Sequence, residues 1–375
     1  MTTSHSPQFS RRSAIALGTA AATIPVLARA QDATPVATPL AAPERTGWFS
    51  YGRDLTGTRA TLDGVITSAN AVSLAQIWSF PVEGPVSATP IIVDGVVYVG
   101  SYDGNLYAID LYSGQEIWRY ASGSDVIEPN LQVPLGITGS AHVDGDVVYV
   151  GDSAAVLHAI DRASGQVIWR QRVDEQPNAS IWSSPIVVGG VAYVAVASIA
   201  KEVGFRGGVV ALDVATASIL WHSYVVPEGA DGAGVFSVPV VDSERGLIIV
   251  GTQNAYDSTP APYGNPISIV AFDLVTGDLV WAFNAPPNDG QNSPTDDVGF
   301  SASPNLFSVS DDGVQRDLVG QGQKSGDFWA VDRETGAQVW VTNLSPAGFL
   351  GGMEGSSAFA DGTIVPVVFD DQNPM

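Results

Sequence analysis

Short apolar runs alternate with polar positions along most of the chain, and each run ends at a turn residue. The stretch 98–118, YVGSYDGNLYAIDLYSGQEIW, holds two such runs around an Asp-Gly turn, followed by a Gly-containing turn and a Trp. A period of two bounded by Asp and Gly predicts antiparallel strands joined in hairpins. We expect four strands in this part of the chain, within residues 87–93, 96–101, 106–110 and 115–118.

The end of this stretch recurs, giving five copies with the same internal spacing. In every copy an Ala stands ten residues before a Trp, and an Asp stands eight residues before it. The members are Ala108, Ala159, Ala211, Ala271 and Ala330; Asp110, Asp161, Asp213, Asp273 and Asp332; and Trp118, Trp169, Trp221, Trp281 and Trp340. Successive Trp residues lie 51, 52, 60 and 59 positions apart, so only the connections vary in length, as in repeat architectures.

Repeated four-stranded units predict an all-β fold, namely a β-propeller of four-stranded antiparallel blades. A set of sandwiches or a β-solenoid is the alternative, and the regular hairpin spacing favours blades. We expect each Trp to cover the seam between neighbouring sheets and each repeated Ala to allow close packing near the axis.

The ends of the repeat region predict an incomplete ring. Residues 70–80 look like a lone final strand that carries Trp78, and such a strand completes the last blade of many propellers. The C-terminal stretch supplies about two strands of a sixth blade after about five complete ones. Because an open propeller exposes unpaired strand edges, we expect a chain truncated from a seven- or eight-bladed ring.

Charge and cysteine content exclude several classes of function. The net charge of −23 argues against nucleic acid and anionic membranes as partners of the surface as a whole. The absence of Cys excludes disulfides, iron–sulfur clusters and covalently attached haem. A redox role would therefore need a non-covalent cofactor and an outside electron acceptor.

The N-terminal 30 residues have the pattern of an export signal. The pair Arg11 and Arg12, an apolar stretch and the small-x-small sequence 28–30 are typical of a twin-arginine signal peptide. The usual aromatic residue after the Arg pair is missing, so ordinary secretion stays open. We expect residues 31–46 to form a Pro/Ala/Thr-rich linker and residues 47–375 the propeller. The expected location is periplasmic or extracellular, with no membrane span after signal cleavage.

The repeat Ala-x-Asp-x-x-Thr-Gly-x-x-x-Trp resembles the pyrroloquinoline-quinone (PQQ) repeat. Residues 48–59 (WFSYGRDLTGTR), 205–213 (FRGGVVALD) and 322–336 (GQKSGDFWAVDRETG) are similar to quinoprotein alcohol dehydrogenases, in the branch with polyvinyl alcohol dehydrogenase. The resemblance covers roughly residues 47–371. It implies an exported quinoprotein that oxidises an alcohol, which could be polymeric, with PQQ and Ca²⁺. Electrons would pass to an external acceptor such as a cytochrome.

The same repeat occurs in non-catalytic propellers, which leaves a second interpretation open. The chain could be a scaffold for protein interaction that resembles the outer-membrane assembly lipoproteins, or an inactive truncated fragment. No lipidated Cys follows the signal, which argues mildly against the scaffold.

The resemblance implies two Ca²⁺ ligands and a catalytic base. The motif EVGFRGG matches Glu202 to a glutamate ligand, and the turn GTQN matches Asn254 to an asparagine ligand. Asp297 takes the place of the general base, with Asp296 and Asp289 as near alternatives. The alternatives without a function are that Glu202 is a solvated loop carboxylate and that Asp297 lies in a loop that is only acidic.

Two further residues match cofactor-binding positions of the family. Lys324 corresponds to the basic residue held against the quinone oxygens, and Phe236 to a Trp that stacks on the quinone. Lys324 is one of only two Lys in the chain, although a surface lysine is the alternative. The sequence departs from the family at Phe236, at Gln253 in place of a Gly, and in lacking an adjacent Cys pair. An enzyme requires the metal, base and lysine residues to converge at one end of the axis, whereas a scaffold lets them scatter.

Overall fold

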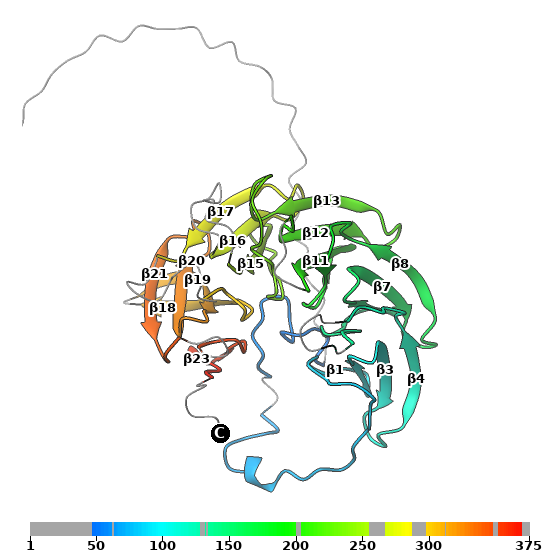
Figure 1. Cartoon of the computed structure of the whole chain (residues 1–375). Coiled ribbons are helices and arrows are strands. Elements are labelled where there is room, and N and C mark those ends of the chain that lie inside the picture. Colours follow the sequence, from blue (N-terminus) through cyan, green and yellow to red (C-terminus); the bar gives the residue numbers. More distant parts are fainter. Residues whose placement is uncertain are drawn as a thin grey trace, which may run out of the picture. The chain divides into compact units, whose positions relative to one another are not determined.

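The computed structural model describes residues 47–369, apart from 62–63, 128–131, 133, 200–203, 255–266, 287–297, 312 and 348–351. The predicted signal and linker therefore lie outside the described residues. Five sheets, each built on four consecutive antiparallel strands, follow one another round a common centre (Figure 1). A two-stranded sheet comes after them in the chain. The predicted all-β propeller with five complete blades and a partial sixth is confirmed.

The blades are numbered here in chain order. Their strands are β1 (Ile91–Val93), β2 (Val96–Gly100), β3 (Asn105–Asp110) and β4 (Glu116–Ala121) in blade 1; β5 (His142–Asp144), β6 (Val147–Gly151), β7 (Val156–Asp161) and β8 (Val167–Arg172) in blade 2; β10 (Ile186–Val188), β11 (Val191–Ser198), β12 (Gly208–Asp213) and β13 (Ile219–Tyr224) in blade 3; β14 (Val240–Asp242), β15 (Leu247–Gly251), β16 (Ser268–Asp273) and β17 (Leu279–Asn284) in blade 4; and β18 (Asn305–Asp311), β19 (Val314–Gly322), β20 (Asp327–Asp332) and β21 (Gln338–Asn343) in blade 5. The short β9 (Ala179–Ser180) pairs with β11, and β22 (Ala358–Ala360) with β23 (Thr363–Val365) form the partial sixth unit.

In each blade the fourth strand lies outermost, as β4, β8, β13, β17 and β21 show in Figure 1. The strand order equals the chain order, so every connection within a blade is a hairpin. The repeated Asp closes the last of these hairpins. In blade 1 the Asp110 carboxylate accepts hydrogen bonds from the backbone N–H of Ser113 (2.7 Å) and of Tyr112 (3.2 Å).

In blades 1 to 4 the repeated Trp reaches across to the next blade, as predicted, whereas Trp340 of blade 5 is 37% exposed. The indole N–H of Trp118 in blade 1 donates to the backbone carbonyl of Arg162 in blade 2 at 3.0 Å. The Trp281 indole does the same to Arg333 at 3.1 Å. The ring of Trp118 also covers Gly165, where a Cβ atom would lie only 2.7 Å from the indole. Because its ring packs on the next blade and its N–H is hydrogen-bonded there, this Trp holds two sheets together.

The prediction that the repeated Ala packs near the axis is wrong. These residues lie in the third strand of each blade, and Ala108 is fully buried between Tyr98 of β2 and Trp118 of β4. The rings of Tyr98 and Trp118 meet across it with centroids 5.8 Å apart. Blades 2 and 3 repeat this Tyr–Trp pair at 5.9 Å. A small residue is needed there because a larger side chain would separate the two rings.

The prediction for residues 70–80 holds for the side chain but not for the backbone. Trp78 donates its indole N–H to the carbonyl of Leu111 at 2.8 Å, as Trp118, Trp169 and Trp281 do across their seams. However, the short helix η1 (Ala71–Ser73) precedes it, and residues 74–82 form no strand. A fourth strand needs a third strand beside it, and β22 and β23 pair only with each other among the described residues.

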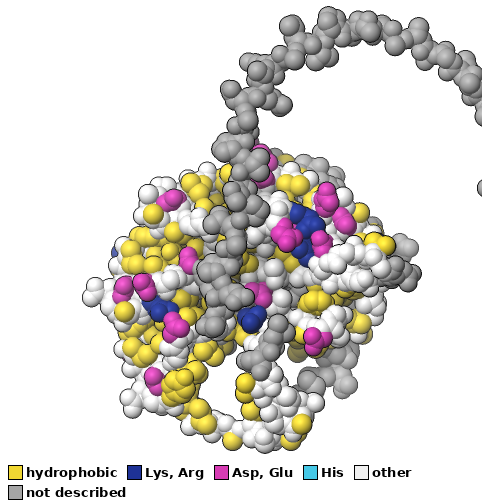
Figure 2. Space-filling view, turned by 180° about the vertical axis from the view of Figure 1, so that it is seen from behind, with side chains coloured by type: hydrophobic (Ala, Val, Ile, Leu, Met, Phe, Trp, Pro, Cys, Tyr) yellow, Lys and Arg dark blue, Asp and Glu magenta, His cyan; other side chains and the backbone are white. Residues whose placement is uncertain are grey.

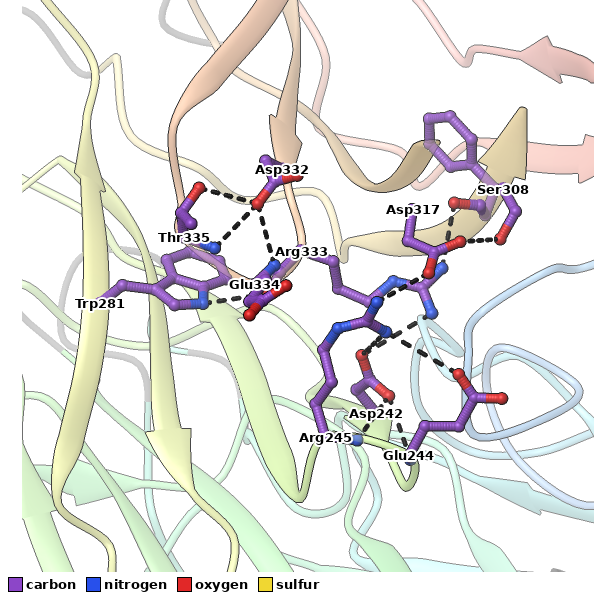
Figure 3. A network of polar contacts seen from close by, with 11 residues as sticks. Asp242, Glu244, Arg245, Trp281, Ser308, Asp317, Asp332, Arg333, Glu334 and Thr335 are labelled. Atoms are coloured by element: carbon purple, nitrogen blue, oxygen red, sulfur yellow. Dashed lines mark hydrogen bonds and ion pairs between the residues drawn. The ribbon is translucent and has the colours of Figure 1, made fainter. Parts of the chain in front are cut away.

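A cluster of charged side chains joins blades 4 and 5 (Figure 3). Arg245 donates to the Asp317 carboxylate at 2.7 Å and to Asp242 at 3.2 Å. Arg333 also approaches the buried Asp242, at 3.7 Å. Acidic side chains lie scattered over the face seen in Figure 2, with few basic ones beside them. No helix in the described part of the chain is long and apolar enough to cross a membrane.

Candidate functional site

A cavity of about 510 Å³ lies where the inner ends of the blades meet. Most of its lining side chains carry hydroxyl groups, four are aromatic, and two are charged. The lining residues are Tyr51, Ser87, Ala88, Tyr102, Thr138, Gly139, Ser140, Trp182, Ser183, Ser184, Phe236, Val238, Gln253, Ser301, Ser303, Lys324 and Glu354.

Two positions of the blade repeat supply most of the lining. The first position lies four residues before the first strand of each unit, and its occupants are Ser87, Thr138, Trp182, Phe236, Ser301 and Glu354. The second lies two residues after the glycine that ends the second strand, and supplies Tyr102, Gln253 and Lys324. Because a propeller brings equivalent positions together around its centre, residues hundreds of positions apart share one cavity.

Trp182 and Phe236 form an aromatic wall contributed by two neighbouring blades. Their ring centroids lie 5.8 Å apart and their planes are tilted by 47°. The Trp182 indole N–H donates to the carbonyl of Ser198 at 3.0 Å, which fixes the ring. This wall offers π-faces to a flat ligand. Trp182 is not among the residues predicted from the sequence, although aligning the repeats on their first strands places it at the position equivalent to Phe236.

Lys324 and Glu354 form an ion pair in the cavity, with Nζ and Oε1 3.0 Å apart. The Lys324 side chain is only 8% exposed, whereas the Glu354 side chain is 38% exposed. The two come from different units: Lys324 follows β19 in blade 5, and Glu354 precedes β22 in the partial sixth unit. No other side chain that lines the cavity in the described part of the chain is charged.

Hydroxyl groups make a polar rim that ties the blades together. The Oγ of Ser184 accepts a hydrogen bond from the Ser140 backbone N–H at 2.9 Å. In the same way the Oγ of Ser303 accepts from the Val238 N–H at 2.8 Å. The Oγ of Ser140 is itself buried without a hydrogen-bond partner. A buried hydroxyl left unsatisfied is costly, so a ligand that bonded it would gain affinity.

The residues predicted from the sequence are placed as follows. Lys324 and Phe236 line the same cavity. Asn254 directly follows the lining residue Gln253 but does not itself line the cavity in the described structure. Glu202 and Asp297 lie outside the described residues, as do the alternatives Asp296 and Asp289.

Gln253, noted above only as a departure from the family, bridges two blades. Its side-chain Nε2 donates to the Oγ of Ser301 at 2.6 Å, and its backbone N–H donates to the carbonyl of Gly234 at 3.0 Å. A glycine at this position could not make the first contact, so the amide side chain helps to shape the cavity.

Acidic metal ligands do not cluster in the described residues. No group of three or more His, Cys, Asp or Glu side chains that could hold a metal ion occurs among them. The predicted pairing of Glu202 with Asn254 stays a prediction.

Comparisons with known proteins agree with this architecture. The family model described as "Outer membrane protein assembly factor BamB" matches residues 113–365, and the model described as "Glucose/ethanol/alcohol dehydrogenase, beta-propeller domain" matches residues 48–134. The chain is 25% identical to a polyvinylalcohol dehydrogenase of Pseudomonas sp over 85% of this chain and 55% of that protein. It is 28% identical to the quinohemoprotein alcohol dehydrogenase ADH IIB of Pseudomonas putida over 78% of this chain and 46% of that protein.

Solved structures give the same result. The quinohemoprotein alcohol dehydrogenase from Comamonas testosteroni superposes with a TM-score of 0.67 at 25% identity, covering 86% of this chain and 52% of that one. The chain thus spans about half the length of the curated relatives it matches. Its five repeat copies, blade topology and matching family models together show that the chain belongs to the PQQ-repeat family of β-propellers.

Proposed function

We propose that this propeller binds PQQ together with Ca²⁺ in the central cavity and oxidises an alcohol. The observation that carries the proposal is that Lys324 and Phe236, chosen from the family resemblance, line one cavity beside the aromatic Trp182. The names of the relatives, which are alcohol dehydrogenases, support the same class of reaction.

The cavity fits the cofactor in size and in most of its chemistry. A volume of about 510 Å³ lies within the usual range for small-molecule sites. PQQ is a flat tricarboxylate, so it needs π-faces, a cation and hydrogen-bond donors. The aromatic wall, the Lys324 ammonium and the unsatisfied hydroxyl of Ser140 offer one of each.

Different residues of the chain would contact the ring, the oxygens and the metal ion. Trp182 and Phe236 would pack against the ring plane, and the Lys324 ammonium would hold negatively polarised oxygens. When bound, the quinone would supply the acceptor for the hydride that the alcohol loses. The Asp297 carboxylate would accept the hydroxyl proton of the alcohol as general base. Glu202 and Asn254 would provide oxygen ligands for Ca²⁺.

The setting of the reaction is part of the proposal. The N-terminal pattern supports export by a twin-arginine signal to the periplasm or outside the cell. The 375 residues contain no Cys that could attach haem covalently, so we propose that the electrons pass to an acceptor outside this part of the chain, such as a cytochrome. One relative is named as a 1-butanol dehydrogenase (cytochrome c), which supports this choice of acceptor. Polyvinyl alcohol is the first substrate to assay, because two relatives are named for it.

A titration of the purified chain with PQQ, followed by intrinsic Trp fluorescence, tests the proposal. We expect saturable quenching that strengthens with Ca²⁺ and weakens in Lys324→Ala. Glu228→Gln is the matched control, because Glu228 is exposed and lies outside the cavity lining. A well-folded sample that binds no PQQ at any Ca²⁺ concentration would overturn the proposal.

A non-enzymatic scaffold is the second candidate. The match of residues 113–365 to the model described as an outer-membrane assembly factor favours it, since that match is the longer of the two. Exposed apolar side chains such as Val72 (92% exposed) and Ile77 (80% exposed) would suit a protein contact. A folded chain that fails the PQQ titration would leave this candidate.

A further inference from the structure

We infer that Glu354 competes with an anionic ligand for the Lys324 ammonium and thereby sets how tightly the cavity binds that ligand. This inference rests on the proposed binding of PQQ. It assigns a role to a residue that neither the repeat motif nor the family resemblance singled out.

The ion pair is unequal in its access to solvent. The Lys324 side chain is 8% exposed, so its ammonium depends on a partner within the cavity. The Glu354 side chain is 38% exposed, so its carboxylate can rotate towards water without losing solvation. An incoming carboxylate can therefore replace Glu354 at Lys324. The buried Lys324 side chain cannot turn towards water in the same way.

The backbone holds the two residues in register. The N–H of Met353 donates to the carbonyl of Gln323 at 3.1 Å, which joins the turn that carries Lys324 to the segment that carries Glu354. Gly352, with φ of +74°, lies against the backbone of Lys324, where a Cβ atom would clash. The packing of the partial sixth unit on blade 5 thus places the Glu354 carboxylate next to the Lys324 ammonium.

The blade architecture itself does not require an acid at this position. The equivalent residues of the five complete blades are Ser87, Thr138, Trp182, Phe236 and Ser301, none of which is charged. Glu354 introduces the only negative side chain among the described residues that line the cavity, and it neutralises the only positive one. A tricarboxylate entering this cavity meets a lysine already occupied and a like charge beside it.

The test compares Glu354→Gln with the unchanged chain by fluorescence titration at low ionic strength. We expect Glu354→Gln to bind PQQ about tenfold more tightly, because a like charge near the ligand is removed. Glu354→Asp, which keeps the charge, should stay close to the unchanged chain. The uncharged trimethyl ester of PQQ should bind both equally, which separates charge from shape.

The sign of the effect separates competition from a merely structural role. If Glu354 only positioned Lys324, then Glu354→Gln would bind PQQ more weakly, and that result would overturn the inference, as would unchanged affinity. Glu354→Ser provides a second variant if Glu354→Gln fails to fold, since Ser occupies the equivalent position in blades 1 and 5.

A second probe, benzene-1,2,4-tricarboxylate, separates this inference from the proposed function. If no variant binds PQQ but the tricarboxylate binds more tightly to Glu354→Gln, the proposed cofactor is wrong and the inference holds. If PQQ binds the unchanged chain and Glu354→Gln alike, the inference fails alone. If Glu354→Gln binds neither anion, both are overturned.

Discussion

The indole N–H of Trp118 donates to the backbone carbonyl of Arg162 across the seam between blades 1 and 2, at 3.0 Å. Trp118 is 9% exposed, and its ring covers the turn of the next blade. Trp340 holds the same repeat position in blade 5, which is followed by a two-stranded unit in the described part of the chain, and is 37% exposed. In the 375-residue chain the pair therefore compares a buried and a partly exposed Trp at one repeat position.

We expect Trp118→Ala to lower the free energy of unfolding by about 3–5 kcal/mol, because it removes a buried indole and leaves a cavity. Trp340→Ala should cost clearly less. Trp118→Phe should cost about 1 kcal/mol or somewhat more, since it keeps a ring and loses the hydrogen bond. Denaturant midpoints of the three variants measure this. Equal losses of unfolding free energy in the two Trp→Ala variants would show that packing against the next blade does not contribute to stability.

The turn beneath each Trp gives a second prediction. Gly165 has φ of +72°, whereas the third copy places Ala217 at the equivalent position with φ of +58°. Gly165→Ala should destabilise the chain by more than about 1 kcal/mol, because it adds left-handed strain and a clash with Trp118. Ala217→Gly should be stabilising by up to about 1 kcal/mol. Thermal unfolding of both variants measures these stability changes. A loss of stability in Ala217→Gly would contradict the prediction.

The charge cluster between blades 4 and 5 predicts a pH dependence. Hydrogen bonds from Ser308 and then from Arg245 hold the pKa of Asp317 below its ordinary value (Figure 3). A carboxyl with a lowered folded-state pKa contributes stability above its unfolded pKa of about 3.9. That contribution is lost as the pH falls through the folded-state pKa.

Asp317→Asn should therefore lower the melting temperature at neutral pH, and the difference should shrink in acid as the pH falls through the lowered pKa of Asp317. Glu244→Gln is the control, because Glu244 is 81% exposed and lies 3.8 Å from Arg245. A difference for Asp317→Asn that is the same at neutral and at acidic pH would mean that packing, and not charge, is lost.

The aromatic wall predicts the source of fluorescence quenching by PQQ. Trp182→Leu should weaken PQQ binding about fivefold to tenfold, because one stacking surface is removed. It should also abolish part of the quenching, since the indole lies at the cavity. Trp340→Leu, outside the cavity lining, should leave the affinity unchanged. Unchanged affinity in Trp182→Leu would place the ligand elsewhere.

The unsatisfied hydroxyl of Ser140 predicts opposite effects on the stability of the unliganded chain and on ligand binding. Because its Oγ has no hydrogen-bond partner, Ser140→Ala should leave the unliganded chain as stable or stabilise it by up to about 1 kcal/mol. The same variant should bind PQQ more weakly if the ligand uses this group. Melting temperatures with and without PQQ measure both effects. A marked loss of stability without ligand would show that the hydroxyl already serves the fold.

The sequence by itself determined the blades, their number and most of their strands, because a period of two and the Asp and Gly turns act over neighbouring residues. The strand expected within residues 70–80 is the exception. It also located Trp118 and its equivalents at the seams, since a large aromatic at constant spacing must be buried against something. Lys324 and Phe236 came from motifs that the family resemblance supplied.

Only the tertiary structure decided what meets at the centre. Trp182, Phe236 and Glu354 stand 54 and 118 residues apart in turn, and no local pattern joins them. They share a cavity because each lies four residues before the first strand of its unit, and the packing of blades brings those positions together. The same packing paired Lys324 with Glu354, because contacts between units depend on how whole blades fit, not on the spacing within one.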